Sequence, residues 1–351
     1  MIFYLLVALL PLLVCHRYDK LPEHKKTSKI RDKYLFWTLI AIFLTIAFRH
    51  YSMGTDTNGY LEDFVRFANL DWKAAIDDTR MEPGYVVFSK IIAHITSSPK
   101  VFQVIYVAIY FLCYYSFVQK FEGLLPFYFL FFFVTLGEYM FFFTGVRQCL
   151  AISLCLFSYR FLLSKKWYFF LLTIAVAYTI HHSVVLFLIV YPLSNRKITY
   201  YNILLYLGVL YFASNYLLLA QMYLNDKLDY NYEIEAIDSG LIFMLLLFAL
   251  TIISFIYVIY KNRNVNKIMT ILFNVNIVTL FFWVLRLQTR VAERPSFYFL
   301  PFSCMLFAYV LKDCRDNIVR IGMVIVPLLY FAYRFTTTFK LFVPYKTFFF
   351  D

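Results

Sequence analysis

LLPFYFLFFFVTLGEYMFFFTGVRQCLAISLCLFSYRFLL, residues 124–163, is apolar along most of its length. Because a helix needs about 20 residues to cross the hydrocarbon core of a bilayer, this stretch is long enough for two crossings. Backbone polar groups in lipid must bond to one another, and the stretch lacks the alternating pattern of a barrel strand. It therefore predicts an all-α membrane protein.

The rest of the chain has the same apolar character. Its 351 residues are 62% hydrophobic and 22% aromatic, and the mean hydropathy is +0.69. No polar block is large enough to fold by itself, so we expect one integral membrane domain over residues 1–351. Its larger outer loops are predicted at 49–100 and 220–240. This composition excludes an ordinary soluble domain.

About 12 transmembrane crossings are predicted from the apolar segments. They lie roughly at residues 1–15, 34–48, 101–118, 124–143, 146–164, 167–181, 183–193, 200–218, 241–260, 268–287, 296–311 and 318–335. Residues 84–97 are too short for a simple crossing. We expect a re-entrant or interfacial helix there that begins at Glu82-Pro83, since proline suits a first helical turn.

The orientation follows from HRYDKLPEHKKTSKIRDK, residues 16–33, which contains seven Lys or Arg. Basic residues concentrate in cytoplasmic loops. The acidic residues gather elsewhere, with seven in 49–83 and five in 220–240, which places these loops outside. Topology thus accounts for the net charge of +12, and we expect no nucleic-acid partner. The six scattered cysteines predict neither disulfides nor a metal site.

Five groups of ionisable residues lie at the predicted outer ends of apolar segments. Charges at such positions are costly and usually mark function. In the first two groups, Arg49, Asp56 and Glu82 offer a cation and two carboxylates. Alternatively, Arg49 extends to the interface and Asp56 caps a helix. Glu82 is likewise either a base or a plain helix cap.

The third group is Arg147-Gln148, within an otherwise apolar run. A guanidinium presents a planar fork of donors to two phosphate oxygens, and the neighbouring amide adds another donor. The alternative is a structural salt bridge between Arg147 and Glu138. The fourth group, His181-His182, provides a general base, a phosphate donor or a bond to a nearby carbonyl.

The fifth group has arginines at every fourth position: Arg286, Arg290 and Arg294. This spacing predicts that they stack along one helical face, where Glu293 can hold one of them. An anionic ligand explains three stacked cations, and a belt at the membrane interface is the alternative. The acidic and tyrosine-rich loop 220–240 has the composition of either a sugar-binding surface or a solvated loop. No nucleotide-binding or metalloprotease motif is present, and we expect no cofactor.

These groups, in this order, resemble the EpsG/Wzy-like family of membrane polysaccharide polymerases. The resemblance spans roughly residues 1–311. The matching residues are Arg49 with Gly54, Asp56 and Tyr60; Glu82-Pro83-Gly84-Tyr85; Arg147-Gln148 with Ala151; His181 with Ser183; and Arg290 or Arg294 before Tyr298-Phe299.

The resemblance implies a polymerase of O-antigen, capsule or exopolysaccharide. It would join undecaprenyl-diphosphate-linked repeat units at the outer face of the bacterial plasma (inner) membrane. It also implies an architecture like that of GT-C glycosyltransferases, with a flippase and a chain-length regulator as partners. The candidate bases are then Asp56, Glu82 and His181. The candidate diphosphate ligands are Arg49, Arg147, Gln148, Arg290 and Arg294.

Two other functions compete with the polymerase. A flippase or transporter for the same lipid-linked oligosaccharide also needs a cationic cavity, but it must open that cavity to both faces in turn. The sequence has no internal repeat, and its candidate site residues lie on one predicted side. A membrane ligase or acyltransferase acting on surface glycans is the second alternative.

Overall fold

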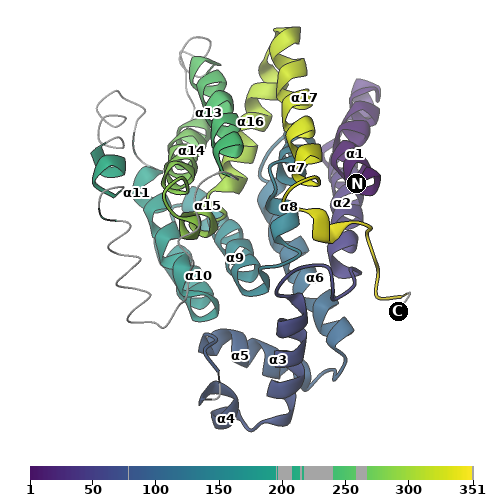
Figure 1. Cartoon of the computed structure of the whole chain (residues 1–351). Helices are drawn as coiled ribbons and strands as arrows, with labels where there is room; N and C mark the ends of the chain where they lie inside the picture. The colour runs from purple at the N-terminus through teal and green to yellow at the C-terminus, as the bar shows by residue number, and fades with distance from the viewer. Residues whose placement is uncertain are drawn as a thin grey trace. The chain divides into compact units, whose positions relative to one another are not determined.

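The computed structural model describes residues 1–77, 79–194, 196, 208–213, 216, 240–257 and 267–349. These residues form helices, turns and a single isolated β-bridge, which confirms the predicted all-α class. The α-helices are α1 (Ile2–Asp19), α2 (Ser28–Ala47), α3 (Thr57–Asn69), α4 (Trp72–Asp77), α5 (Pro83–Ala93), α6 (Pro99–Val118), α7 (Leu125–Thr135), α8 (Glu138–Phe141), α9 (Val146–Leu163), α10 (Trp167–Ile180), α11 (Val190–Leu193), α13 (Leu241–Ile256), α14 (Lys267–Leu285), α15 (Glu293–Ser296), α16 (Leu300–Asp313) and α17 (Asn317–Arg334) (Figure 1).

Contacts divide the chain into two compact units. The first comprises Met1–Phe187 and Pro327–Asp351, and the second comprises Leu188–Val326. In the first unit, α9 packs against both α6 and α10, while α1 packs against α7. In the second, α14 packs against α13 and α16. The helix α17 runs through the sequence boundary between them.

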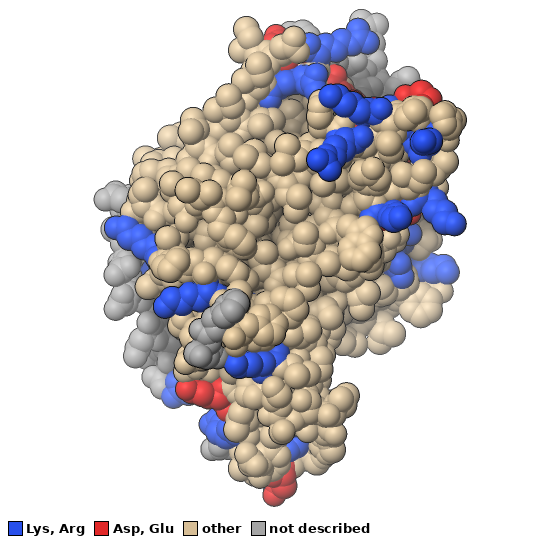
Figure 2. Space-filling view, turned by 90° about the vertical axis from the view of Figure 1, so that its right-hand side faces the viewer, with Lys and Arg blue, Asp and Glu red and all other residues tan. Residues whose placement is uncertain are grey.

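Five of the described helices are long and apolar enough to cross a membrane: α1, α6, α9, α14 and α17. A sixth crossing results if the chain from Arg290 to Ser296 and α16, which meet at a bend of 63°, form one broken span. The apolar helices α5, α7, α10 and α13 are shorter. On the face drawn in Figure 2, most of the surface is uncharged, and Lys and Arg outnumber Asp and Glu. The chain is thus a multi-pass membrane protein by its apolar helices.

The predicted span 124–143 is not a continuous helix. Helix α7 ends at Thr135, and α8 begins at Glu138. Between them, Gly137 has φ +92°, a left-handed conformation that only glycine adopts without steric cost. The break coincides with Gly137-Glu138, which the prediction of a single span passed over because the segments on both sides are apolar.

The predicted outer loop 49–100 contains helices of its own. It folds into α3, α4 and α5, and α3 and α4 both pack against α5. As predicted, α5 begins at Pro83, immediately after Glu82. The other predicted outer loop, 220–240, lies outside the described residues except for Gly240, as does most of the predicted span 200–218.

Candidate functional site

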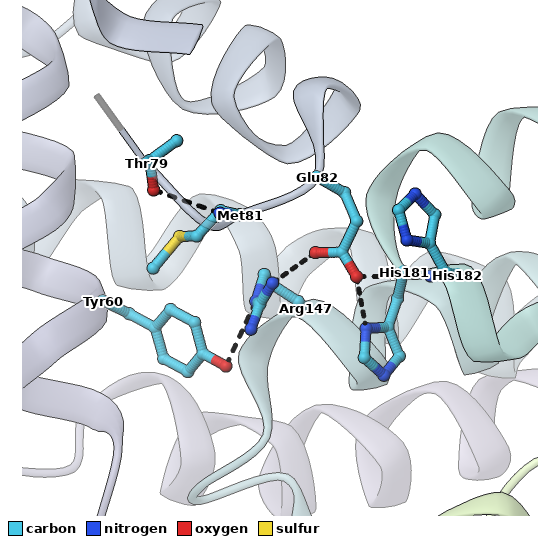
Figure 3. A network of polar contacts seen from close by, with 7 residues as sticks. All are labelled: Tyr60, Thr79, Met81, Glu82, Arg147, His181 and His182. Atoms are coloured by element: carbon cyan, nitrogen blue, oxygen red, sulfur yellow. Dashed lines mark hydrogen bonds and ion pairs between the residues drawn. The ribbon is translucent and has the colours of Figure 1, made fainter. Parts of the chain in front are cut away.

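Glu82, the residue before α5, has a carboxylate that contacts two side chains and one backbone N–H. Pro83 fills the first helical position, where its missing N–H is not needed. Glu82 is the N-cap residue of α5, but its carboxylate makes no capping bond to this turn. Its Oε2 bonds to Nη1 of Arg147. Its Oε1 lies 3.0 Å from Nδ1 of His181 and accepts from the backbone N–H of His182 at 3.3 Å (Figure 3).

Arg147 is held in the first turn of α9 by two partners on different helices. Besides its bond to Glu82, its Nε donates to the hydroxyl of Tyr60 at 3.5 Å. The guanidinium carbon lies 5.8 Å from the centroid of the Tyr60 ring, where a cation is attracted by the ring quadrupole. Tyr60 comes from the first turn of α3. The arginine thus links α3, the start of α5 and α9.

Glu138 is not the partner of Arg147, so the alternative of a structural salt bridge between them is wrong. The Glu138 side chain is fully buried, and its Oε1 accepts from the hydroxyl of Tyr114. Glu138 and Arg147 belong to different helices, α8 and α9, which the turn at 142–145 separates. Proximity in sequence therefore misidentified the acid that pairs with Arg147.

His181 lies where α10 ends. Its backbone is extended, with φ −156° and ψ 114°, although its N–H still bonds to the Ala177 carbonyl at 2.9 Å. This change of direction aims the next N–H, that of His182, at the carboxylate of Glu82. In Figure 3 the two imidazole rings point to opposite sides. Only the ring of His181 contacts Glu82.

Gly84 permits the close approach of helices that brings Glu82 to His181. A Cβ atom at this position would lie 2.1 Å from Oγ1 and 2.6 Å from the carbonyl oxygen of Thr179, near the end of α10. Real Cβ atoms do not approach other atoms so closely. The glycine in the sequence Glu82-Pro83-Gly84-Tyr85 is therefore required by packing between α5 and α10.

We expect Gly84→Ala to lower the melting temperature of the purified full-length protein in detergent. Forcing a methyl group into a packed contact costs about 1–3 kcal/mol. Gly59→Ala is the matched control, because a Cβ at Gly59 meets no atom within 4 Å and alanine favours helices such as α3. If the Gly84→Ala and Gly59→Ala proteins have the same melting temperature, the packing argument is contradicted.

Glu82 is held in its charged form. Burial raises the pKa of its carboxyl, but the hydrogen bond from His181 and the charge of Arg147 outweigh this effect and lower the pKa to about 2. The Glu82 side chain is 9% exposed, Arg147 is 23% exposed and His181 is 21% exposed. The cluster therefore combines a largely buried anion with a cation and an imidazole that both reach the surface.

The depressed pKa of Glu82 makes part of the stability depend on pH. An unfolded glutamate titrates near pH 4.5, so the folded state gains its full contribution above that pH. This contribution is lost as the pH falls from about 4.5 towards 2. The Glu82→Gln side chain has no carboxylate to protonate in this pH range. We expect a smaller fall in its melting temperature than in the wild type between pH 6 and pH 3, and equal falls contradict the assignment.

Arg49 does not extend to the interface, because its side chain is fully buried. Its Nη1 donates to the Ile46 carbonyl at 2.6 Å, and its Nη2 donates to the hydroxyls of Thr57 at 3.3 Å and Tyr106 at 3.0 Å. Thr57 in turn donates to the Phe143 carbonyl at 2.7 Å. The guanidinium therefore ties α2 to α6 and to the start of α3.

The contact with Phe143 fixes the two helix starts that carry Tyr60 and Arg147. Gly54 has φ +122°, and a Cβ there would lie 1.9 Å from the Phe143 carbonyl oxygen. The turn before α3 thus packs directly on the segment that leads into α9. Arg49 supports this arrangement from within the core, and its guanidinium bonds to Ile46, Thr57 and Tyr106 rather than to Glu82 or His181.

Two further candidates from the sequence, among the described residues, do not bond to the carboxylate of Glu82. Asp56 precedes α3 and is exposed, and its side chain makes no capping bond to that helix. Gln148 is buried within α9, next to Arg147. Among the described residues, the structure brings Glu82, Arg147 and His181 together, and it leaves Asp56 outside this group.

The three arginines of the fifth group do not stack along one helix. Helix α14 ends at Leu285, and a separate 3₁₀ turn begins at Arg290 before α15 starts at Glu293. The i, i+4 prediction fails because it requires a continuous helix. Arg286 is buried and donates to Glu293 at 3.0 Å, as expected for one of the three. Arg290 and Arg294 are exposed in the second unit.

Sequence reasoning missed two members of the cluster. Tyr60 is part of the family resemblance, but the sequence has 31 tyrosines and nothing in it distinguishes Tyr60 as a site residue. The backbone N–H of His182 has no side-chain signal at all. Its role follows from the end of α10, which the doubled histidine marks only as an interruption of an apolar run.

A comparison with protein families matches residues 33–347 to the family described as the EpsG family. No curated protein matches the chain, and no solved structure matches it.

Proposed function

Because the chain belongs to the EpsG family, which is linked to exopolysaccharide biosynthesis, we propose that it is a polysaccharide polymerase. Its substrates are oligosaccharide repeat units linked to undecaprenyl diphosphate. The reaction transfers the growing chain from its lipid diphosphate to a hydroxyl of the incoming unit. It takes place at the outer face of the bacterial plasma membrane.

One observation carries this proposal: Arg147, Glu82 and His181 meet in a partly exposed cluster within an apolar protein. Glycosyl transfer from a diphosphate needs a cation that takes up charge on the leaving group and a base that takes a proton from the attacking hydroxyl. Arg147 provides a fork of donors suited to phosphate oxygens. Among the described residues, its Nη2 has no hydrogen-bond partner and can meet a ligand.

The other candidates take supporting roles in this proposal. Arg290 and Arg294 are exposed in the second unit, and their part in diphosphate binding stays a prediction from the sequence. Arg49 and Gln148 are buried, so we assign them a structural role in this part of the protein. Asp56 is a weaker candidate for the base because the cluster does not include it. No energy source beyond the diphosphate bond is needed.

The proposal includes the topology expected from the sequence. The basic segment 16–33 lies in the cytoplasm, about 12 crossings follow a GT-C-like arrangement, and the start of α5 faces outward. The bilayer, a flippase that delivers repeat units and a chain-length regulator are the expected partners.

Complementation tests the proposal directly. A strain that lacks its own copy is given the wild-type chain, and its surface glycan is separated on a gel. We expect a long ladder with the chain and single repeat units on the outer face without it. Repeat units that accumulate inside the cell without the chain support a flippase instead. A polymer of normal length that is merely not attached to the surface supports a ligase.

A further inference from the structure

Both oxygens of the Glu82 carboxylate already have hydrogen-bonding partners. Oε2 bonds to Arg147, while Oε1 faces His181 and the backbone N–H of His182. An ionised carboxylate can only accept hydrogen bonds. The ring nitrogen that faces it, Nδ1 of His181, must therefore carry a hydrogen and donate it.

This bond determines which nitrogen of His181 is basic. A neutral imidazole carries one hydrogen, so Nδ1–H leaves a lone pair on Nε2. No described residue donates to Nε2, and the His181 side chain is 21% exposed. The charged and titratable groups around the ring are Glu82 from the start of α5, Arg147 from α9 and the adjacent His182.

We propose that Nε2 of His181 is the proton acceptor for the incoming sugar hydroxyl, and that Glu82 is a positioning residue that fixes its tautomer and orientation. This inference rests on the proposed polymerase function. It separates three candidates that the sequence left equal, and it gives the carboxylate and the imidazole different tasks.

The step balances as a single transfer. The hydroxyl proton of the incoming unit passes to Nε2, and the oxygen forms a bond to the anomeric carbon of the growing chain. The bond from that carbon to the diphosphate oxygen breaks, and the lipid diphosphate leaves with the electron pair. Arg147 lies beside Glu82 to stabilise the charge that develops on the leaving group. The resulting imidazolium returns its proton to water.

The competing candidates are poorer proton acceptors for physical reasons. A base works best when its pKa lies near the operating pH, and the pKa of Glu82 is lowered to about 2 while both its oxygens are engaged. Asp56 is exposed and has no side-chain bond to the cluster among the described residues. His181 combines an accessible lone pair with a fixed ring.

Two substitutions separate the roles, and a third provides the control. His181→Asn retains a side-chain N–H near the position of Nδ1 but removes Nε2. Glu82→Gln keeps the shape of the side chain, but its oxygen must face the cation Arg147, so its NH₂ faces His181. The ring must then accept at Nδ1 and carry its hydrogen on Nε2. His24→Asn is the matched control, because His24 is exposed in the 3₁₀ turn Glu23–Lys25 and is not part of the cluster.

The first measurement is polymer formation in the complemented strain at equal membrane levels of each variant. We expect His181→Asn and Glu82→Gln to lower it by at least about 100-fold, the smallest usual contribution of general base catalysis. His24→Asn should remain within a few-fold of wild type. A His181→Asn protein with a normal ladder overturns the inference. If Glu82→Gln abolishes polymer while His181→Asn does not, Glu82 itself is the base.

The second measurement reads the tautomer without relying on turnover. The purified full-length protein is labelled with ¹⁵N-histidine, and the spectrum of His181→Asn identifies the signals of His181 among the six histidines. We expect hydrogen on Nδ1 in the wild type and on Nε2 in Glu82→Gln. The same tautomer in both proteins overturns the positioning role. A merely structural contact would not move the hydrogen.

Binding of undecaprenyl diphosphate distinguishes this inference from the function on which it rests. We expect the wild type, His181→Asn and His24→Asn to bind it with similar affinity in detergent. If the wild type neither binds it nor supports polymer, the proposed function itself fails. If the wild type binds and polymerises and His181→Asn does the same, only the assignment of His181 is wrong.

Discussion

Arg147→Ala is expected to abolish the long glycan ladder and leave single repeat units on the outer face of the cell. Two losses combine. The leaving diphosphate loses a donor aimed at its developing charge, which typically costs 10²–10³ in rate. The Glu82 carboxylate, which is 9% exposed, loses its cation. The surface glycan of the complemented strain on a gel, at matched membrane levels, gives the measurement.

Arg160→Ala provides the control within the same helix. Arg160 lies at the other end of α9 and donates to the hydroxyl of Ser116 at 2.7 Å, away from the cluster. The two variants remove the same side chain from the same helix. If both leave the ladder normal, the diphosphate is not bound at the start of α9. If both abolish it, the effect belongs to the stability of α9 and not to the site.

Arg49→Ala is expected to cause the largest loss of folded protein. The substitution leaves three buried partners without their donor: the Ile46 carbonyl and the hydroxyls of Thr57 and Tyr106. Each buried polar group that loses its hydrogen bond costs about 1–3 kcal/mol, and truncation also opens a cavity. The amount of monodisperse protein after extraction in mild detergent, together with its melting temperature, measures the effect.

Two further variants give the Arg49 result its meaning. Arg49→Lys keeps the charge but not the planar fork that reaches three groups, so we expect an intermediate loss. Arg66→Ala removes an exposed arginine paired with Asp63 at 2.7 Å, and such pairs are worth about 0–1 kcal/mol. An Arg49→Ala protein as stable as Arg66→Ala would show that the buried guanidinium does not hold α2, α3 and α6 together.

The class of the fold could be predicted because lipid leaves the backbone few choices. Apolar runs of sufficient length gave α6 and α9 almost at their observed bounds, 99–118 and 146–163. The interruptions could not be predicted in the same way. Gly137 and Glu138 lie between long apolar stretches, and a single glycine in such a run does not by itself predict the left-handed conformation that ends α7.

The members of the site could be predicted better than their arrangement. Glu82, Arg147 and His181 were each identified as ionisable groups at the ends of apolar segments. Their pairing joins residues 65 and 99 positions apart, which periodicity does not address. The nearest acid along the chain, Glu138, was the natural partner for Arg147 on sequence alone, and it proved to be buried against Tyr114.

The burial of individual side chains could not be predicted from the sequence either. Arg49 was expected either to bind a diphosphate or to extend to the interface, because arginines are seldom buried in full. Its acceptors are the Ile46 carbonyl at the buried end of α2 and the hydroxyls of Thr57 and Tyr106, and nothing in their residue types marks them as partners of an arginine. Only their convergence in space makes a buried guanidinium tolerable.

The cluster at the start of α5 is electrically balanced as it stands. One guanidinium and one carboxylate cancel, and an imidazole with hydrogen on Nδ1 alone adds no charge. A diphosphate that docks beside Arg147 disturbs this balance, so its arrival favours uptake of a proton by a nearby group. Under the proposed function, affinity for the lipid diphosphate should therefore weaken as the pH of the surrounding medium rises, which links the occupancy of the site to acidity.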